Sequence, residues 1–159
     1  MSKSPENSQY KTSTAFSKRI KHLIYENECD SNTDLAKLIG VGPIIISNAV
    51  NYGIIPSTRT LIKIANKFDL SLKYLLGIDN INNFIPSANP SNFPTRIAQL
   101  TEENNLNYGK VASQTSFTRM YIYQWNKKCT IPSLDYLFEI ADYFKVSPDY
   151  LLGRTDYRN

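Results

Sequence analysis

The chain contains two stretches with nearly the same sequence. Residues 56–77 read PSTRTLIKIANKFDLSLKYLLG and residues 132–153 read PSLDYLFEIADYFKVSPDYLLG, with eleven of the 22 aligned residues identical at an offset of 76. Upstream the similarity continues at an offset of 77, which predicts one extra residue in the polar loop between residues 27 and 35. Such self-similarity indicates two copies of one structural unit of about 65 residues, enough for one small core each.

The repeat also predicts the domain organisation. The chain divides into a flexible N-terminal tail, a first domain, a linker and a second domain, at residues 1–13, 14–79, 80–92 and 93–159. The linker, NINNFIPSANPSN, contains two prolines and many small polar residues, as interdomain connections do. Its two apolar residues, Phe84 and Ile85, are expected to dock on one of the domains.

Each copy is expected to fold as five short helices. Apolar residues recur at helical spacing throughout and no stretch alternates with period two, so we predict an all-α protein. The first helix contains Phe16, Ile20 and Leu23, matched by Phe93, Ile97 and Leu100. The second helices are expected at about 32–39 and 108–114, and the third after Gly42 and Thr118. The fourth helices are capped by Ser57 and Ser133, and the fifth run from Ser71 and Ser147 to Gly77 and Gly153.

Composition restricts the function. The net charge of +4 and pI of about 9.0 are compatible with a polyanionic partner. No apolar run approaches the roughly 20 residues of a membrane span, and no secretory signal is evident, so a cytoplasmic protein is expected. The two cysteines, Cys29 and Cys129, stand apart from each other and from His22, the one histidine, which argues against a metal site. No nucleophile motif or phosphate-binding loop is present, so we expect no catalytic residue and no cofactor.

A helix, a tight turn and a second helix form the arrangement that inserts into the DNA major groove. Residues 33–53, TDLAKLIGVGPIIISNAVNYG, have its parts: Leu35 and Ala36 inside the first helix, Gly40 at the turn, and Ile46 and Ala49 inside the second helix. Residues 108–128, YGKVASQTSFTRMYIYQWNKK, repeat the pattern with Ser116 at the turn. The sequence resembles the lambda-repressor-like (Cro/XRE) helix-turn-helix family, in two tandem five-helix copies. The resemblance rests on LAKLIGV, on IPS separated from IA by six residues, and on LLG.

The resemblance implies a sequence-specific regulator that binds double-stranded DNA, a repressor of phage or mobile-element type. DNA contacts would come from the third helix of each copy and from the start of the second. In the second copy these positions hold Tyr108, Lys110, Thr118, Arg119, Met120, Tyr121, Tyr123, Gln124, Lys127 and Lys128. Arg119 suits guanine and Gln124 suits adenine, while the lysines would neutralise phosphates.

The first copy is a less obvious DNA reader. Its candidate positions are Asn32, Ile44, Ile45, Ser47, Asn48 and Asn51. Isoleucine can touch a thymine methyl but carries no hydrogen-bond code, and adjacent exposed apolar residues often mark protein contacts. Three roles stay open for Ile44 and Ile45: DNA contact with a thymine preference, a homodimer or partner surface, or packing against Phe84 and Ile85. The alternative function is therefore a protein-binding module, such as an inhibitor, antitoxin or anti-repressor.

One departure from the family concerns charge. Many members carry a glutamate in the reading helix that pairs with an arginine of the first helix, but here those positions hold Val50 and Asn126. Arg19 and its counterpart Arg96 therefore need other partners. A phosphate is one possibility, and a carboxylate such as Glu26 or Glu103 is another.

Overall fold

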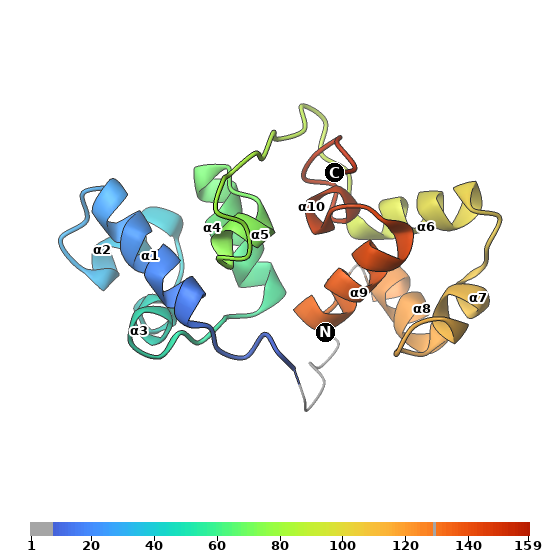
Figure 1. Cartoon of the computed structure of the whole chain (residues 1–159), viewed down its shortest axis with the longest axis horizontal. Helices are drawn as coiled ribbons and strands as arrows, with labels where there is room; N and C mark the ends of the chain where they lie inside the picture. The colour runs from blue at the N-terminus through green and yellow to red at the C-terminus, as the bar shows by residue number, and fades with distance from the viewer. Residues whose placement is uncertain (1–7, 129) are drawn as a thin grey trace. The chain divides into compact units, whose positions relative to one another are not determined.

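The computed structural model describes residues 8–128 and 130–159, which form two compact units, Ser8–Phe84 and Ile85–Asn159 (Figure 1). We call them the first and the second unit. The elements in the described residues are helices, apart from one isolated antiparallel bridge between Thr12 and Ile54. The all-α expectation is confirmed. Cys129 and tail residues 1–7 lie outside the described residues.

The first unit packs five helices around one apolar core. They are α1 (Thr14–Glu26), α2 (Asn32–Ile39), α3 (Pro43–Tyr52), α4 (Thr58–Phe68) and α5 (Leu72–Leu75). Each helix contributes apolar side chains that are almost fully buried, among them Phe16, Ile20, Leu35, Ile46, Leu61, Ile64 and Leu75. Side-chain caps begin four of the helices, from Ser13, Ser31, Ser57 and Ser71.

The second unit contains five helices in the same order. They are α6 (Phe93–Glu103), α7 (Tyr108–Ser113), α8 (Arg119–Lys128), α9 (Leu134–Phe144) and α10 (Pro148–Leu151). Its core includes Phe93, Ile97, Val111, Ile122, Trp125, Leu137, Ile140 and Leu151. Trp125 occupies in α8 the repeat position that Ala49 holds in α3, so the second core is built around a much larger side chain.

The connections agree with the offset change in the repeat. Residues 27–31 join α1 to α2, whereas the shorter segment 104–107 joins α6 to α7. The second residue of each loop is left-handed, Glu28 (φ 54°) and Asn105 (φ 55°). The extra residue of the first copy therefore lies in this loop.

The fifth helix of each unit returns to the start of its first helix. The chain turns there at Gly77 and Gly153, both with φ 75°. A Cβ atom on Gly77 would lie 2.6 Å from Cβ of Ala15, and one on Gly153 would overlap the backbone of Ser91. Both the left-handed backbone and the close approach require glycine at these two positions.

The described part of the expected tail is hydrogen-bonded. The Ser13 N–H donates to Gly53 O (2.8 Å), and the Ile55 N–H donates to Lys11 O (3.0 Å). Both are backbone hydrogen bonds, so the side chains of the tail do not predict them. The expected linker is divided between the two units after Phe84. In its first part, the Asn82 side chain forms hydrogen bonds with the backbone of Asp69 and Ser71.

One expected helix cap differs. Ser133 occupies the N-cap position of α9, but its side chain makes no capping hydrogen bond and is buried. The equivalent Ser57 does cap α4, through the Thr60 N–H at 3.3 Å.

The turn before the third helix is tied to the fourth helix in both units, but with opposite charge. In the first unit, Gly40 is left-handed (φ 88°) and its carbonyl accepts a 2.5 Å hydrogen bond from Lys63 Nζ. In the second, Ser116 stands at the turn, and its N–H and hydroxyl both donate to the Glu139 carboxylate. Lys63 and Glu139 occupy the same repeat position. The lysine donates to the carbonyl of its own turn, and the glutamate accepts from the N–H and the hydroxyl of its own turn.

Replacing Glu139 with lysine should loosen this turn. Glu139→Lys removes both acceptors from Ser116, and we expect it to lower the free energy of unfolding by about 1 kcal/mol. Ser116→Gly combined with Glu139→Lys rebuilds the pair of the first unit, so the double variant should be more stable than the sum of the single changes predicts, by about 0.5–1 kcal/mol. Urea unfolding followed by the fluorescence of Trp125, the one tryptophan, measures these free energies. Strictly additive effects would show that the turn and the residue at position 139 are not coupled.

Candidate nucleic-acid interface

The buried face of α8 determines which of its residues reach solvent. Ile122 and Trp125 are 0% and 1% exposed and anchor the helix in the second unit. The opposite face is open, with Met120 59% and Tyr123 53% exposed. Exposed side chains on α8 and the turn before it are those of Thr118, Arg119, Met120, Tyr123, Gln124, Lys127 and Lys128.

An aromatic cluster holds α8 in place. The Trp125 ring centroid lies 5.7 Å from that of Phe93, 5.2 Å from that of Phe117 and 5.9 Å from that of Tyr121. Tyr121 also packs at 5.5 Å against Tyr136, and burial raises the pKa of the Tyr136 hydroxyl. Tyr121, a candidate reader in the sequence, is therefore half-buried and part of the support under the helix.

A second aromatic contact joins α7 to α8. The rings of Tyr108 and Tyr123 meet edge to face, with centroids 5.7 Å apart and planes at 79°. Tyr108 begins α7, which is capped by the Asn107 side chain through the Lys110 N–H at 2.8 Å. This pair brings the start of α7 beside the exposed face of α8, as the resemblance implies for a DNA-binding surface.

The charge on these two helices has one sign. Four cations lie on them, Lys110 on α7 and Arg119, Lys127 and Lys128 on α8, and neither helix contains an acidic residue. All four side chains are exposed. Within the part of the chain that the structure describes, none of the four forms an ion pair. The surface is therefore suited to a polyanion.

The equivalent face of the first unit has a different character. Ile46 and Ala49 bury α3, which has no charged residue along its length. Ile44 is 65% exposed and Asn51 is exposed, whereas Ile45, Ser47 and Asn48 are half-buried. Asn32, the other candidate, is half-buried in the first turn of α2. This face offers apolar contact and amide groups rather than charge.

Neither first-helix arginine pairs with the glutamate of its own helix, Glu26 or Glu103. Arg19 donates from Nε to the Tyr74 carbonyl (3.0 Å), and its guanidinium lies 3.7 Å from the centroid of the Tyr74 ring. Arg96 lies 4.0 Å over the ring of Tyr150. Each arginine therefore stacks on the tyrosine of its own fifth helix.

The two glutamates are engaged elsewhere. Glu26 pairs with His22 at 2.8 Å. Hydrogen bonds from Gln99 and from Arg158 lower the pKa of Glu103. The sequence left a phosphate or a nearby carboxylate such as Glu26 or Glu103 open as the partner of each arginine. In the structure the fifth helix provides a flat aromatic surface that each guanidinium covers, and Arg96 also lies 3.5 Å from the carboxylate of Asp156.

The described ranges contain neither a metal cluster nor a membrane-spanning helix. No group of three or more His, Cys, Asp or Glu side chains there could hold a metal ion. No helix in those ranges is long and apolar enough to cross a bilayer.

Comparison with known proteins gives one finding. Residues 31–75 match a family model, HTH_3, described as Helix-turn-helix. No curated protein and no solved structure matches the chain. The matched residues run from the N-cap of α2 to the end of α5 and contain the turn at Gly40. This part of the chain is similar to DNA-binding helix-turn-helix domains of the Cro/XRE type, and the match indicates a DNA-binding regulator of that type.

Proposed function

We propose that the chain is a sequence-specific regulator of transcription that binds double-stranded DNA through two tandem helix-turn-helix units, and that it acts as a repressor of phage or mobile-element type. The main reading helix is α8. The observation that carries the proposal is the charge of α7 and α8: the two helices carry four exposed cations and no acidic residue, and Tyr123 and Gln124 are exposed on α8.

Paired backbone features support a duplicated unit. Asp69 (φ 51°) and Lys145 (φ 56°) are left-handed at the same repeat position, directly after α4 and α9. The arginine–tyrosine stacks also recur at equivalent positions, Arg19 with Tyr74 and Arg96 with Tyr150. Non-glycine residues adopt a left-handed backbone uncommonly, so its recurrence at matched positions favours a common architecture.

The exposed residues of α8 supply the chemistry of base recognition. Arg119 can donate two hydrogen bonds to a guanine, and Gln124 can both donate to and accept from an adenine. The lysines on the same face contact phosphates, which fixes position without selecting sequence. Two such units on one chain would cover two half-sites, about 34 Å apart if one helical turn separates them. Because α3 and α8 differ, the two half-sites need not be the same.

A protein-binding role for α3 is the second candidate. It is favoured by the exposure of Ile44 (65%) and Tyr52 (70%) at opposite ends of an uncharged helix. In that case the apolar face would contact a second copy or another protein, and DNA binding would depend on the second unit.

Substitutions in α8 test the reading role. Arg119→Ala should weaken binding to a site selected from random duplexes by about 1–3 kcal/mol and relax the base preference at one position. Lys127→Ala should weaken binding equally to all sequences and reduce the slope of log K against log salt by about 1. Fluorescence anisotropy at several salt concentrations measures both, with Lys21→Ala on α1 as the control for loss of a positive charge. An equal loss on every sequence for Arg119→Ala would remove it from base reading, and selection that enriches no motif would contradict the proposed function.

A charge placed on α3 tests the second candidate. If α3 is a protein contact, Ile44→Glu should abolish self-association in sedimentation and leave the DNA contacts of α8 intact, because a carboxylate cannot be buried unpaired in an apolar interface. Tyr25→Glu, at an 82% exposed position on α1 outside the helix-turn-helix pair, is the matched control for charge. Loss of DNA binding by an Ile44→Glu chain that stays folded and monomeric would assign this face to DNA instead.

A further inference from the structure

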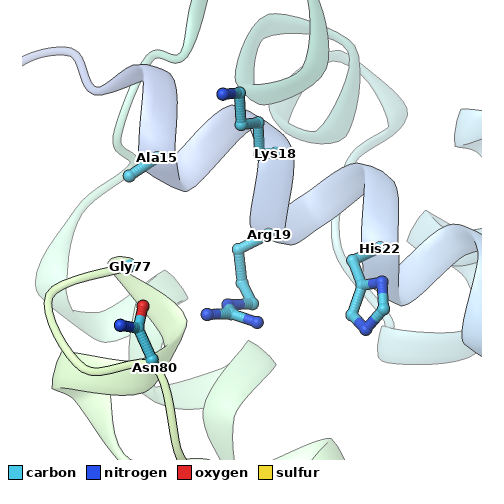
Figure 2. Close-up of a pocket in the computed structure, with 6 residues that line it drawn as sticks. All are labelled: Ala15, Lys18, Arg19, His22, Gly77 and Asn80. Atoms are coloured by element: carbon cyan, nitrogen blue, oxygen red, sulfur yellow. The ribbon is translucent and has the colours of Figure 1, made fainter.

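The first unit has an open pocket away from its helix-turn-helix pair. It lies between α1 and the turn after α5 and has a volume of about 350 Å³ (Figure 2). Its lining consists of Ala15, Lys18, Arg19, His22, Gly77 and Asn80. Two of these residues are permanent cations and none is acidic, so the lining favours an anion.

Arg19 is held in place for binding. The Nε–H bond to the Tyr74 carbonyl (3.0 Å) and the stack on the Tyr74 ring fix the plane of the guanidinium. Within the described residues its two terminal nitrogens donate to no protein acceptor. A guanidinium fixed in this way presents a planar pair of donors that matches the two oxygens of a carboxylate or phosphate.

The neighbours of Arg19 leave it accessible. In Figure 2 its side chain extends from α1 toward the turn that carries Gly77 and Asn80, whereas Lys18 extends in another direction. The His22 ring pairs with Glu26, yet about half of its surface (49%) is exposed. Asn80 is exposed and its amide can donate to an oxyanion.

In the second unit, a carboxylate of the chain itself occupies the equivalent position beside the first-helix arginine. Asp156 occupies the repeat position of Asn80, and its carboxylate lies 3.5 Å from the Arg96 guanidinium. The same carboxylate accepts a 2.8 Å hydrogen bond from the Ser87 hydroxyl. The Arg96 residue is buried, 9% exposed, whereas Arg19 is half-buried.

The chain before the first helix accounts for this difference. In the second unit, Ser87 and Ser91 donate backbone hydrogen bonds to Arg154 O and Gly153 O, both at 2.9 Å, and so cover the turn after α10. In the first unit, the corresponding segment pairs instead with the end of α3, where Ser13 donates to Gly53 O. Within the described residues, no corresponding segment covers the turn at Gly77, and Arg19 has no counter-ion there.

We propose that this pocket binds a small oxyanion, a carboxylate or phosphate group, which takes the place that the Asp156 carboxylate occupies in the second unit. Arg19 is its main ligand, and the Asn80 amide and the His22 ring lie at its sides. The inference uses the repeat correspondence but does not depend on DNA binding, and neither α3 nor α8 takes part.

Titration of the full chain tests the site. His22 is the only histidine, so its ring C–H signals in proton NMR report on the pocket without assignment. We expect these signals to shift and saturate on addition of sodium succinate or sodium phosphate, at constant pH and with ionic strength held by chloride. Saturation by one probe and not the other identifies carboxylate or phosphate as the preferred group. Absence of saturation with both would overturn the proposal.

Asn80→Asp is the decisive variant. It supplies the carboxylate that the second unit has, so the apparent Kd of the anion should rise by about tenfold or more. Asn83→Asp adds the same charge three residues away, at an exposed position outside the pocket, and should leave the Kd within about twofold. Arg19→Gln should also abolish saturation. An Asn80→Asp chain that binds as tightly as the parent would refute the site, whether or not the protein binds DNA.

Discussion

The burial of α8 is the constraint on which the second unit's surface depends. Ile122 and Trp125 are three residues apart and point into the core, so the helical period turns Met120, Gln124 and Lys127 to the opposite side. Trp125 is too large to rotate out without losing its contacts with Phe93, Phe117, Tyr121 and Tyr136. The packing thus fixes the exposed face more firmly than aliphatic residues would, since an aromatic cluster specifies orientation as well as burial.

The two units keep one architecture while exchanging local chemistry in matched pairs. At one repeat position Lys63 serves a carbonyl and Glu139 serves an N–H and a hydroxyl, so the charge changes together with the turn residue. At another, the uncharged Asn80 stands where Asp156 pairs with Arg96. In the first case the partner changes to match and the contact survives. In the second case Arg19 is kept in the first unit, but the carboxylate that pairs with its counterpart Arg96 is replaced by the Asn80 amide. The first exchange preserves a contact, whereas the second leaves room for a ligand.

The sequence was sufficient to predict the helices but not the contacts between them. Apolar spacing and the change of offset located the elements and the longer loop, because both are local properties of the chain. The stack of Arg96 on Tyr150 joins residues far apart in the sequence, and nothing in the spacing of α6 distinguishes it from a bond to Glu103. The same holds for Tyr121, whose place on the helix borders both the core and the surface. The backbone hydrogen bonds of Lys11 with Ile55 and of Ser13 with Gly53 do not depend on side chains, so the composition of the segment cannot predict them.

The charge distribution assigns the two units different parts in the proposed function. On α2 and α3 the only charged residues are Asp34 and Lys37, which cancel, whereas α7 and α8 carry cations alone. Release of counterions from DNA supplies affinity in proportion to the phosphates neutralised. The second unit would therefore provide most of the salt-dependent affinity. In the proposed function, the apolar face around Ile44 would add little attraction at long range. It would act only after close contact, by fitting a thymine methyl or a protein surface of the right shape.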